Sequence, residues 1–427
     1  MDIASIHQLF LKCSSISTDT RKIGPQSLFV AIKGDRFDAN TFAAEALQKG
    51  AAYVLIDNPA YHIDQRTIVV QDSLAALQQL AQYHRRYLRL PIIALTGSNG
   101  KTTTKELIHA VLSQRFKAKA TVGNLNNHIG VPLTLLSFDE TTQIGIVEMG
   151  ANHQKEIAFL CDIAEPDFGY ITNFGKAHLE GFGGVEGVIK GKSEMYDYLQ
   201  QNKKTVFVNL DDPIQSEKTA SMERITFGYQ KTEATVNIIA IKADPFVEIA
   251  VEDTLIKSHL IGLYNANNIN AAVTIGRHFG VSNVDIKAAI EGYVPENNRS
   301  QLLNKETNEI ILDAYNANPS SVKVAIENFL QLDKKNKVAI LGDMFELGHE
   351  SLKEHLAIIQ SLQNQTTVDC YFVGKDFFYN RVEGGRRHFF GTFEDLVQHL
   401  QIHPFHNSTL LIKGSRGMAL ERLLDYI

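Results

Sequence analysis

The chain has 427 residues and a formal net charge of −6, with no long run of basic residues. The length suggests about three domains of roughly 150 residues each, and the charge pattern argues against a nucleic-acid partner, which needs clustered cations. The first residues, MDIASIHQLFLK, lack a basic segment followed by an apolar one, and no apolar stretch is long enough to span a bilayer. We therefore expect a cytoplasmic protein without membrane insertion.

Residues 1–89 predict a small α/β domain. Apolar runs with the length of strands alternate here with segments in which apolar side chains recur at helical spacing. The expected strands are residues 27–32, 52–56 and 67–70, and the expected helices are residues 40–49 and 73–87. Leu90-Pro91 then interrupts the pattern and marks a domain boundary.

Residues 90–298 predict a larger, nucleotide-binding domain. Short, almost entirely apolar runs separated by helical segments indicate buried parallel strands. These runs are residues 91–95, 145–148, 169–172 and 205–208. Residues 234–261 alternate apolar and polar side chains without an intervening helix, which predicts an antiparallel extension of the same sheet, and residues 265–278 predict a helix.

Residues 299–427 predict a third, Rossmann-like domain. The polar sequence from Pro295 through Asn297 to Asn298 marks the second boundary. Apolar runs then alternate with helical segments, as in a doubly wound sheet. The runs are residues 310–312, 337–341, 370–373 and 409–412. The expected fold class is therefore α/β, with three domains in series.

An apolar run at residues 91–95 is followed by a glycine-containing loop and the start of a helix at residues 96–105, and this strand–loop–helix order is typical of a triphosphate-binding loop. Glycines let the backbone approach phosphate oxygens, successive N–H groups and the helix N-terminus attract anions, a lysine adds charge and a threonine hydroxyl can bind Mg²⁺. The expected ATP-binding residues are Gly97, Ser98, Asn99, Gly100, Lys101, Thr102 and Thr103. Leu95 stands where the general pattern GxxxxGK[ST] has its first glycine. The alternative is a turn that merely caps a helix.

Two further strand ends carry candidate metal ligands. Glu148 closes an apolar run and would emerge at the carboxyl edge of the sheet, where a carboxylate suits Mg²⁺, although it could simply pair with a lysine. His178 lies in the glycine-rich segment 173–192, where a metal-binding role competes with that of an ordinary surface or core histidine. For Lys192, residue type alone favours a solvated position or a pairing with Glu194.

The third domain places polar loops after several expected strands. One loop begins at Asp313, a second covers residues 342–348 and a third covers residues 413–417, before an expected last helix. Asn, Asp and Pro also form turns for local backbone reasons. Since parallel strands end at one edge of a sheet, we expect the three loops to form the wall of a cleft together.

Several motifs taken in order resemble the Mur ligase family. They are TGSNGKTTTKE, GNLNNHIGVPLTLL, VEMGANHQKEI, AHLEGFG, DAYNANPSS, LGDMFELG and KGSRGMALE. The resemblance covers nearly the whole chain, from residue 17 to residue 421. GKT alone would fit every ligase of this kind, including folylpolyglutamate synthases, whereas NLNNxIGVP, HLEGFG and YNANP together resemble the member that adds a D-alanyl-D-alanine dipeptide.

The resemblance implies a reaction in peptidoglycan synthesis. ATP would phosphorylate the terminal carboxylate of UDP-MurNAc-tripeptide, and the amine of D-Ala-D-Ala would attack the acyl phosphate. Two anions must approach each other in this reaction, so the site needs cations. The resemblance implies that two Mg²⁺ ions lie beside Lys101, and we expect a monomer.

The resemblance also assigns roles to residues. Thr102 and Glu148 match ligands of one Mg²⁺, His178 matches a ligand of the second, and Lys192 matches a lysine that becomes carbamylated and thereby gains the charge of a carboxylate. Asn268, Arg299 and Asp313 match contacts to adenine, phosphate and ribose. The expected substrate-binding residues are Ser17, Asp19, Arg21, Phe37 and Asp38 for the uridine nucleotide, and Asn124, Asn126, Asn127, Tyr315, Asn316 and Asn318 for the peptides.

Three residues depart from the pattern of the family. Asn40, His128 and Tyr264 differ from residues that are common at the matching places, which affects fine substrate preference.

Two other functions are alternatives to the expected reaction. The nearest alternative is a sister ligase that adds a single amino acid to a muramoyl peptide or to folate. A rival of another class is a nucleotide-dependent switch, for which Glu148, His178 and Lys192 would have no joint purpose.

Overall fold

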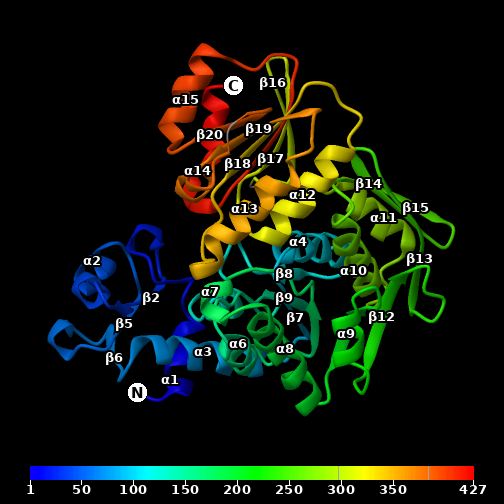
Figure 1. Ribbon diagram of the computed structural model, residues 1–427. Helices are drawn as coiled ribbons and strands as arrows, with labels where there is room; N and C mark the ends of the chain where they lie inside the picture. Colours follow the sequence, from blue (N-terminus) through cyan, green and yellow to red (C-terminus); the bar gives the residue numbers. More distant parts are fainter. Residues whose placement is uncertain (297, 383) are drawn as a thin grey trace.

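Three large β-sheets, each with its own helices, and one two-stranded sheet make up the computed structural model, which describes residues 1–296, 298–382 and 384–427. Asn297, part of the predicted second boundary, lies outside the described residues. Figure 1 shows the N-terminal part in blue beside the central part in cyan and green, with the C-terminal part in yellow to red above it. The predicted α/β class with three domains is confirmed.

The first sheet is small and parallel. Its strands, in spatial order, are β1 (Ile16–Ser17), β2 (Leu28–Val30), β5 (Tyr53–Ile56) and β6 (Thr67–Val69). Helices α1 (Ile3–Phe10) and α2 (Ala43–Gln48) accompany it, together with the hairpin of β3 (Lys33–Gly34) and β4 (Phe37–Asp38). The helix expected at residues 40–49 begins as a 3-10 turn because the Asp38 side chain accepts a hydrogen bond from the Asn40 amide.

Helix α3 (Ser73–Leu88) joins the first sheet to the second. Asp72 caps it by accepting from the Ala75 amide, and Arg89 ends it in a left-handed conformation. Its buried residues recur at helical spacing, and the helix contacts α1 on one side and α5 (Gly130–Leu136) and α6 (Glu156–Ala164) on the other. The N-terminal sheet is thus fixed to the central part through a continuous packed helix.

The central sheet has nine strands: β7 to β13 pair in parallel with one another, whereas β14 pairs antiparallel with both β13 and β15. In spatial order they are β15 (Thr254–Ile261), β14 (Phe246–Val251), β13 (Val236–Ala243), β12 (Arg224–Tyr229), β11 (Thr205–Asn209), β10 (Phe168–Ile171), β7 (Ile92–Thr96), β9 (Ile144–Glu148) and β8 (Ala118–Ala120). The chain leaves β7 toward β8 and β9 on one side and later returns to β10 on the other. This reversal of strand order creates the crevice in which α/β sheets bind ligands.

The helices of the central part follow the predicted alternation. They are α4 (Lys101–Leu112), α5, α6, α7 (Leu179–Phe182), α8 (Val185–Gln201), α9 (Pro213–Lys218), α10 (Asn265–His278) and α11 (Asn283–Gly292). The helix expected at residues 265–278 and the antiparallel extension are confirmed, although β13 pairs in parallel with β12. Among the described residues, no helix has the length and apolar content needed to cross a membrane.

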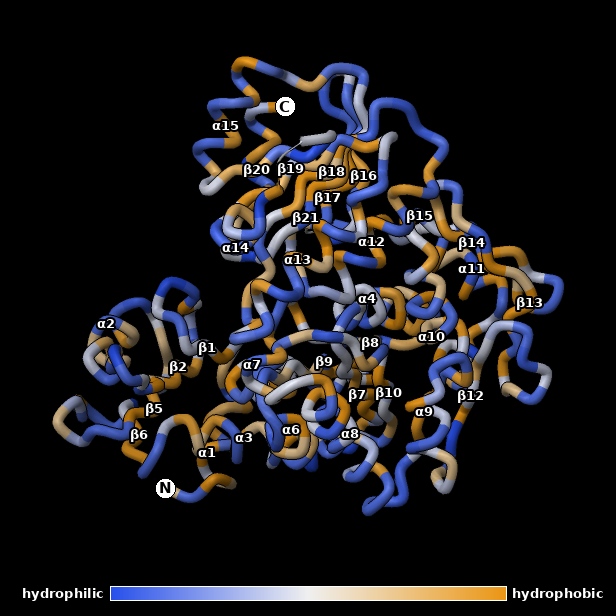
Figure 2. The backbone as a smooth tube through the Cα atoms, viewed as in Figure 1, coloured by the Kyte–Doolittle hydropathy of each residue, from blue (hydrophilic) through white to orange (hydrophobic). Residues whose placement is uncertain are grey.

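The third sheet has six strands. In order they are β16 (Gln301–Lys305), β17 (Asn308–Asp313), β21 (Thr409–Lys413), β18 (Lys337–Gly342), β19 (Val368–Val373) and β20 (Arg387–Phe390), with only β16 antiparallel. Helices α12 (Pro319–Gln331), α13 (Ser351–Ser361), α14 (Lys375–Tyr379) and α15 (Phe393–Ile402) surround it. Figure 2 shows apolar strands inside this part and polar loops around it. The expected last helix is instead a 3-10 helix, Leu420–Asp425.

Candidate active site

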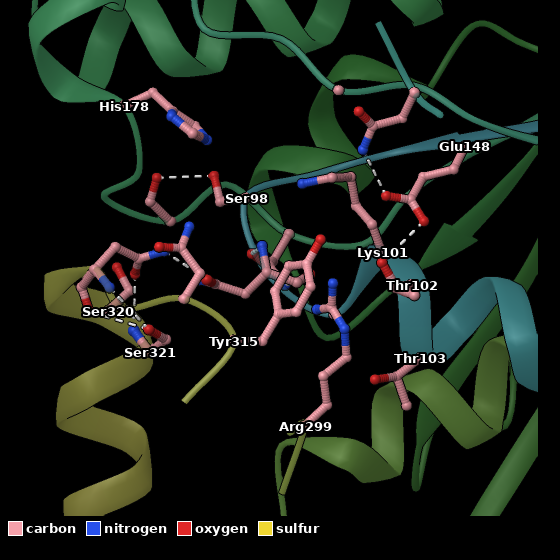
Figure 3. Close-up of a pocket in the computed structure, with 18 of the residues that line it drawn as sticks. Ser98, Lys101, Thr102, Thr103, Glu148, His178, Arg299, Tyr315, Ser320 and Ser321 are labelled. Atoms are coloured by element: carbon pink, nitrogen blue, oxygen red, sulfur yellow. Dashed lines mark hydrogen bonds between the residues drawn. The ribbon is translucent and has the colours of Figure 1, made fainter. Parts of the chain in front are cut away.

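A cavity of ≈ 800 Å³ lies between the central and C-terminal parts. Its central wall comes from the loops that follow β7, β8, β9 and β10, and from the start of α10. Its other wall comes from residues 299–324 and Lys413. Figure 3 shows Lys101, Thr102 and Glu148 facing Arg299 and Tyr315 across this space. Apart from Gly97, the residues expected to bind ATP therefore line the same cavity as those expected to bind peptide.

The loop between β7 and α4 has the backbone of an anion-binding loop. Gly97 and Gly100 have φ of 145° and 79°, and a Cβ at these positions would lie 1.9 Å from Thr172 Oγ1 and 2.7 Å from Asn268 Oδ1. Only glycine fits both the backbone angle and the space. The loop ends at the N-terminus of α4, whose free N–H groups attract negative charge.

Lys101 is the cation of this loop. Its Nζ donates a 2.8 Å hydrogen bond to the Gly97 carbonyl. Desolvation lowers the pKa of the ammonium below its usual value, and the charge of Arg299 adds to this shift, whereas the charge of Glu148 opposes it. A partly buried ammonium whose partner is one carbonyl is under-compensated. An anion entering the cavity would supply the missing charge.

Thr102, Glu148 and Asn126 form a compact group at the ends of α4 and β9. The Thr102 hydroxyl donates to Glu148 Oε2 at 3.0 Å, and Asn126 Nδ2 donates to Glu148 Oε1 at 2.8 Å. Glu148 is 1% exposed, and the ammonium of Lys105 lies 4.0 Å from Oε2. A hydroxyl and a carboxylate side by side are hard oxygen donors of the kind that Mg²⁺ binds.

The other end of the cavity is lined by amide and aromatic side chains. Asn268 accepts from the Thr104 hydroxyl at 3.0 Å and donates to Asn265 at 2.8 Å, so it also connects α4 to α10. The Arg299 guanidinium stacks 3.6 Å from the centre of the Tyr315 ring, as seen in Figure 3. Flat side chains with free polar edges suit a nucleoside base.

Asp313 ends β17 directly opposite Lys413, the last residue of β21. The Lys413 ammonium donates to Asp313 Oδ2 at 2.6 Å and to the Asn316 carbonyl at 3.1 Å. The Ser300 amide donates to Asp313 Oδ1 at 3.3 Å. The carboxylate is therefore fixed at the carboxyl edge of the third sheet, with Lys413 as its counter-ion.

His178 lines the cavity from the loop before α7. Its Nδ1 bonds the carboxylate of Glu346, which belongs to the C-terminal part. This contact holds the pKa of Glu346 below its usual value. The loop at residues 342–348 thus contacts His178 rather than lining the cavity as predicted.

Lys192 is fully buried in α8, so the reading from residue type, a solvated position or a partner of Glu194, is wrong. Glu194 instead accepts from the amides of Lys155 and Ala158 at the start of α6. The Lys192 ammonium lies 5.2 Å from the centre of the Phe182 ring and has no hydrogen-bond partner among the described residues. Burial, reinforced by Lys101, lowers its pKa to about 7. Lys192 does not line the cavity.

The asparagines expected to contact peptide are placed on both walls. Asn124, Asn126 and Asn127 line the central wall, but the Asn127 side chain accepts from the amides of Ile129 and Gly130 and so also caps α5. Asn316 and Asn318 line the opposite wall.

The residues expected to bind the uridine nucleotide lie apart from this cavity, in the N-terminal part. The described residues that line the cavity do not include Ser17, Asp19, Arg21, Phe37 or Asp38. Asp19 pairs with Arg21, whose side chain is 85% exposed. The Phe37 ring stacks on Phe42 and is largely exposed, whereas Asn40 is buried and bonds Asp38 and Asp57.

Sequence reasoning missed several lining residues. Asn173 accepts from the Asn99 amide and donates to the Asn99 carbonyl, which holds the phosphate loop, and Ser300 bonds the Tyr264 hydroxyl. Ser320 accepts from the Lys176 amide across the domain boundary. Only Asn173 had a signal in the sequence, because it follows the apolar run of β10.

A second polar cluster, Asp343, His355 and Asp376, lies in the C-terminal part with its ligand atoms within 4.8 Å of one another. Asp343 accepts from the amides of Asp376 and Phe377, and His355 Nε2 accepts from the Met344 amide. Asp343 thus satisfies backbone groups at the start of α14, His355 satisfies one after β18, and Asp376 accepts from the Ser351 hydroxyl, so the cluster has a structural role.

Comparison with known proteins gives matches over nearly the whole chain. Family models described as "Mur ligase family, catalytic domain", "Mur ligase middle domain" and "Mur ligase, glutamate ligase domain" match residues 12–85, 95–276 and 298–416. A Bacillus subtilis protein named UDP-N-acetylmuramoyl-tripeptide–D-alanyl-D-alanine ligase is 34% identical, over 96% of this chain and 92% of its own length.

Solved structures of MurF ligases also match nearly the whole chain. A crystal structure of MurF from Acinetobacter baumannii has a TM-score of 0.87 and 31% identity, covering 99% of this chain and 97% of that one. A MurF ligase from Thermotoga maritima, solved in complex with ADP, has a TM-score of 0.83 and 26% identity, covering 98% of this chain and 97% of that one.

Proposed function

This chain belongs to the Mur ligase family, and from that premise we propose that it is an ATP-dependent ligase that joins D-Ala-D-Ala to UDP-MurNAc-tripeptide in peptidoglycan synthesis. One observation carries the proposal: the phosphate loop, a buried carboxylate–hydroxyl pair and polar loops of the C-terminal part all line one cavity. Such a cavity has room for ATP next to a peptide carboxylate. The similarity to the B. subtilis ligase over nearly its full length supports the substrate assignment.

ATP binds with its phosphates on the loop of residues 97–103 and its base toward Asn268 and Tyr264. Lys101 turns from the Gly97 carbonyl to the phosphates, so its charge becomes compensated only when nucleotide is present. Arg299 stacks on Tyr315 and supplies a second cation, while Asp313 accepts from the ribose hydroxyls. The MurF complex with ADP supports nucleotide use by this fold.

The donor set fits Mg²⁺. Thr102 and Glu148 would hold one ion, because their oxygens already converge and Asn126 fixes the other carboxylate oxygen. His178 would hold a second. When bound, the ions neutralise charge on the triphosphate so that a carboxylate can approach it.

The reaction then has two steps. The peptide carboxylate attacks the γ-phosphorus, so that its bond to ADP breaks, ADP leaves and an acyl phosphate is formed. The amine of D-Ala-D-Ala attacks the acyl carbon, and phosphate leaves as the amide forms. Lys101 and Arg299 stabilise the charge that moves onto phosphate oxygens, and the asparagines on the two walls orient the peptides.

Lys192 is proposed to be carbamylated. A buried ammonium without a hydrogen-bond partner is unfavourable, and a pKa of about 7 leaves much of the amine neutral and able to add CO₂. The carbamate would be longer than the lysine and negatively charged, so it could extend toward the cavity that the unmodified side chain does not line.

The uridine nucleotide is assigned to the N-terminal part, where the exposed side chains of Arg21 and Phe37 are available. We propose domain boundaries at residues 1–89, 90–298 and 299–427. We also propose a cytoplasmic monomer, since its nucleotide-linked substrates and ATP are cytoplasmic metabolites.

The test is phosphate release with ATP and UDP-MurNAc-tripeptide, with and without D-Ala-D-Ala, combined with mass spectrometry of the product. We expect ADP and a pentapeptide product only when all substrates are present. Release triggered equally by a single amino acid would identify a sister ligase, and substrate-independent ATP turnover would indicate a nucleotide switch. Absence of both ADP and joined product would overturn the proposal.

A further inference from the structure

The loop after β18 reaches across the domain boundary to His178. The Glu346 carboxylate bonds Nδ1 of the imidazole, and the Glu346 carbonyl accepts from the Glu180 amide at 3.3 Å. A Cβ at Gly348 would lie 3.1 Å from the Glu180 side chain, so the backbone of this loop packs closely on α7. Glu346 does not line the cavity, whereas His178 does.

Both partners adopt an unfavourable backbone conformation. His178 has φ of 53° and Glu346 has φ of 62°, in the left-handed region that favours glycine. A left-handed conformation brings Cβ close to the following carbonyl oxygen, so it is unfavourable for these residues. Strained non-glycine residues of this kind cluster at functional sites. Here two of them meet in one contact, from two different domains.

The contact determines which imidazole nitrogen is free. An ionised carboxylate can only accept, so Nδ1 carries the proton and donates to Glu346. In the neutral imidazole, Nε2 then has a lone pair for another partner. Figure 3 shows the imidazole extending from its loop above Ser98, with Lys101 farther along the cavity. Histidine ligands of metals are commonly oriented by a carboxylate in this way.

We infer that Glu346 is a positioning residue: on domain closure it fixes the tautomer and orientation of His178 and so completes the second divalent-cation site. The inference deepens the proposed function and rests on it. In an open arrangement Glu346 would be withdrawn and the imidazole would be free to rotate. Cation binding at His178 and closure of the C-terminal part would therefore stabilise each other.

The same loop offers a matched control. The Lys176 ammonium, two residues before His178, donates to Glu354 of α13 at 2.6 Å. This ion pair also joins the central and C-terminal parts, and Lys176 does not line the cavity. Removing it would weaken closure without changing what faces His178 Nδ1.

The experiment titrates Mn²⁺ into protein saturated with a non-hydrolysable ATP analogue and measures free Mn²⁺ by electron paramagnetic resonance. We expect two bound ions in the unaltered protein and one in His178→Ala. Glu346→Gln should weaken the second ion by about 10- to 100-fold, as is typical when the partner of a metal-binding histidine is removed. Lys176→Gln should retain the second ion within about 3-fold. Circular dichroism would verify that each variant is folded.

Two results would overturn the inference. Glu346→Gln could bind the second ion as tightly as the unaltered protein, or Lys176→Gln could weaken it equally, which would show that closure alone matters. If His178→Ala also keeps two ions, the metal assignment itself is wrong. The ligase assignment is tested separately by product formation, so the failures can be told apart.

Discussion

Replacing Lys101 with methionine should separate stability from function. Methionine has a similar length but no charge, and the ammonium it replaces is partly buried and donates to the Gly97 carbonyl. Because burial lowers the pKa of Lys101, its charge opposes folding of the nucleotide-free protein. The variant should therefore be as stable as the unaltered chain, or more stable, without ATP.

The loss should appear when ATP is added. Charge-assisted hydrogen bonds contribute about 1.5–3 kcal/mol, so losing those to phosphate should weaken binding by about 10- to 100-fold. ATP at about 100 times its Kd stabilises a protein by about 2.7 kcal/mol, and a 100-fold weaker Kd would leave only about 0.4 kcal/mol. For a domain of about 200 residues this removes roughly 5–9 °C of the ATP-dependent rise in Tm.

The assay is thermal unfolding with and without Mg·ATP, alongside product formation. The exposed Lys190 in α8 supplies a control, and Lys190→Met should keep the full ATP-dependent rise. Product formation by Lys101→Met should fall by at least about 100-fold. An unchanged rise in Tm with ATP, or normal turnover, would refute the role given to Lys101.

Three further outcomes are expected. Gly100→Ala should reduce ATP affinity measured by calorimetry at least about tenfold, because its Cβ would lie 2.7 Å from Asn268 Oδ1 at a φ of 79°; unchanged affinity would mean the loop adapts. Acid should destabilise the buried His7–His84 pair: the pKa of His7 is lowered to about 4 by burial and by His84, so the unfolded chain binds more protons between about pH 6.5 and 4 and stability falls as pH drops through that window. Urea unfolding from pH 7 to 4.5 checks this, and His7→Gln should reduce the slope. Lys192→Ala should be inactive and partly restored by a short added carboxylic acid, whereas full activity without it would exclude carbamylation.

Much of the fold is readable from local patterns. The central strands are apolar on both faces, and the phosphate-loop motif follows one of them directly, so β7 and the start of α4 could be predicted from the sequence. Strands β8 and β20 were missed because they are short edge strands whose residues are only half buried. Their existence depends on pairing with a neighbour rather than on their own composition.

Side-chain roles were harder to predict when they depend on distant residues. Lys192 has helical neighbours that indicate a solvated face, and only the tertiary structure encloses it beside Phe182. The Glu346–His178 contact joins residues 168 positions apart. No periodic pattern within one segment reports such a pairing, which explains why the loop at residues 342–348 was assigned to the cavity wall.

Asn318 shows how domain closure and nucleotide binding are connected. Its Oδ1 accepts from the Ser321 amide and caps α12, while its Nδ2 donates to Asn99 Oδ1 in the phosphate loop at 2.7 Å. Capping fixes the amide plane, so the donor can reach Asn99 only when α12 lies against the loop. A phosphate that orders the loop therefore also favours closure. Closure in turn excludes water, which an acyl phosphate requires if the amine rather than water is to attack it.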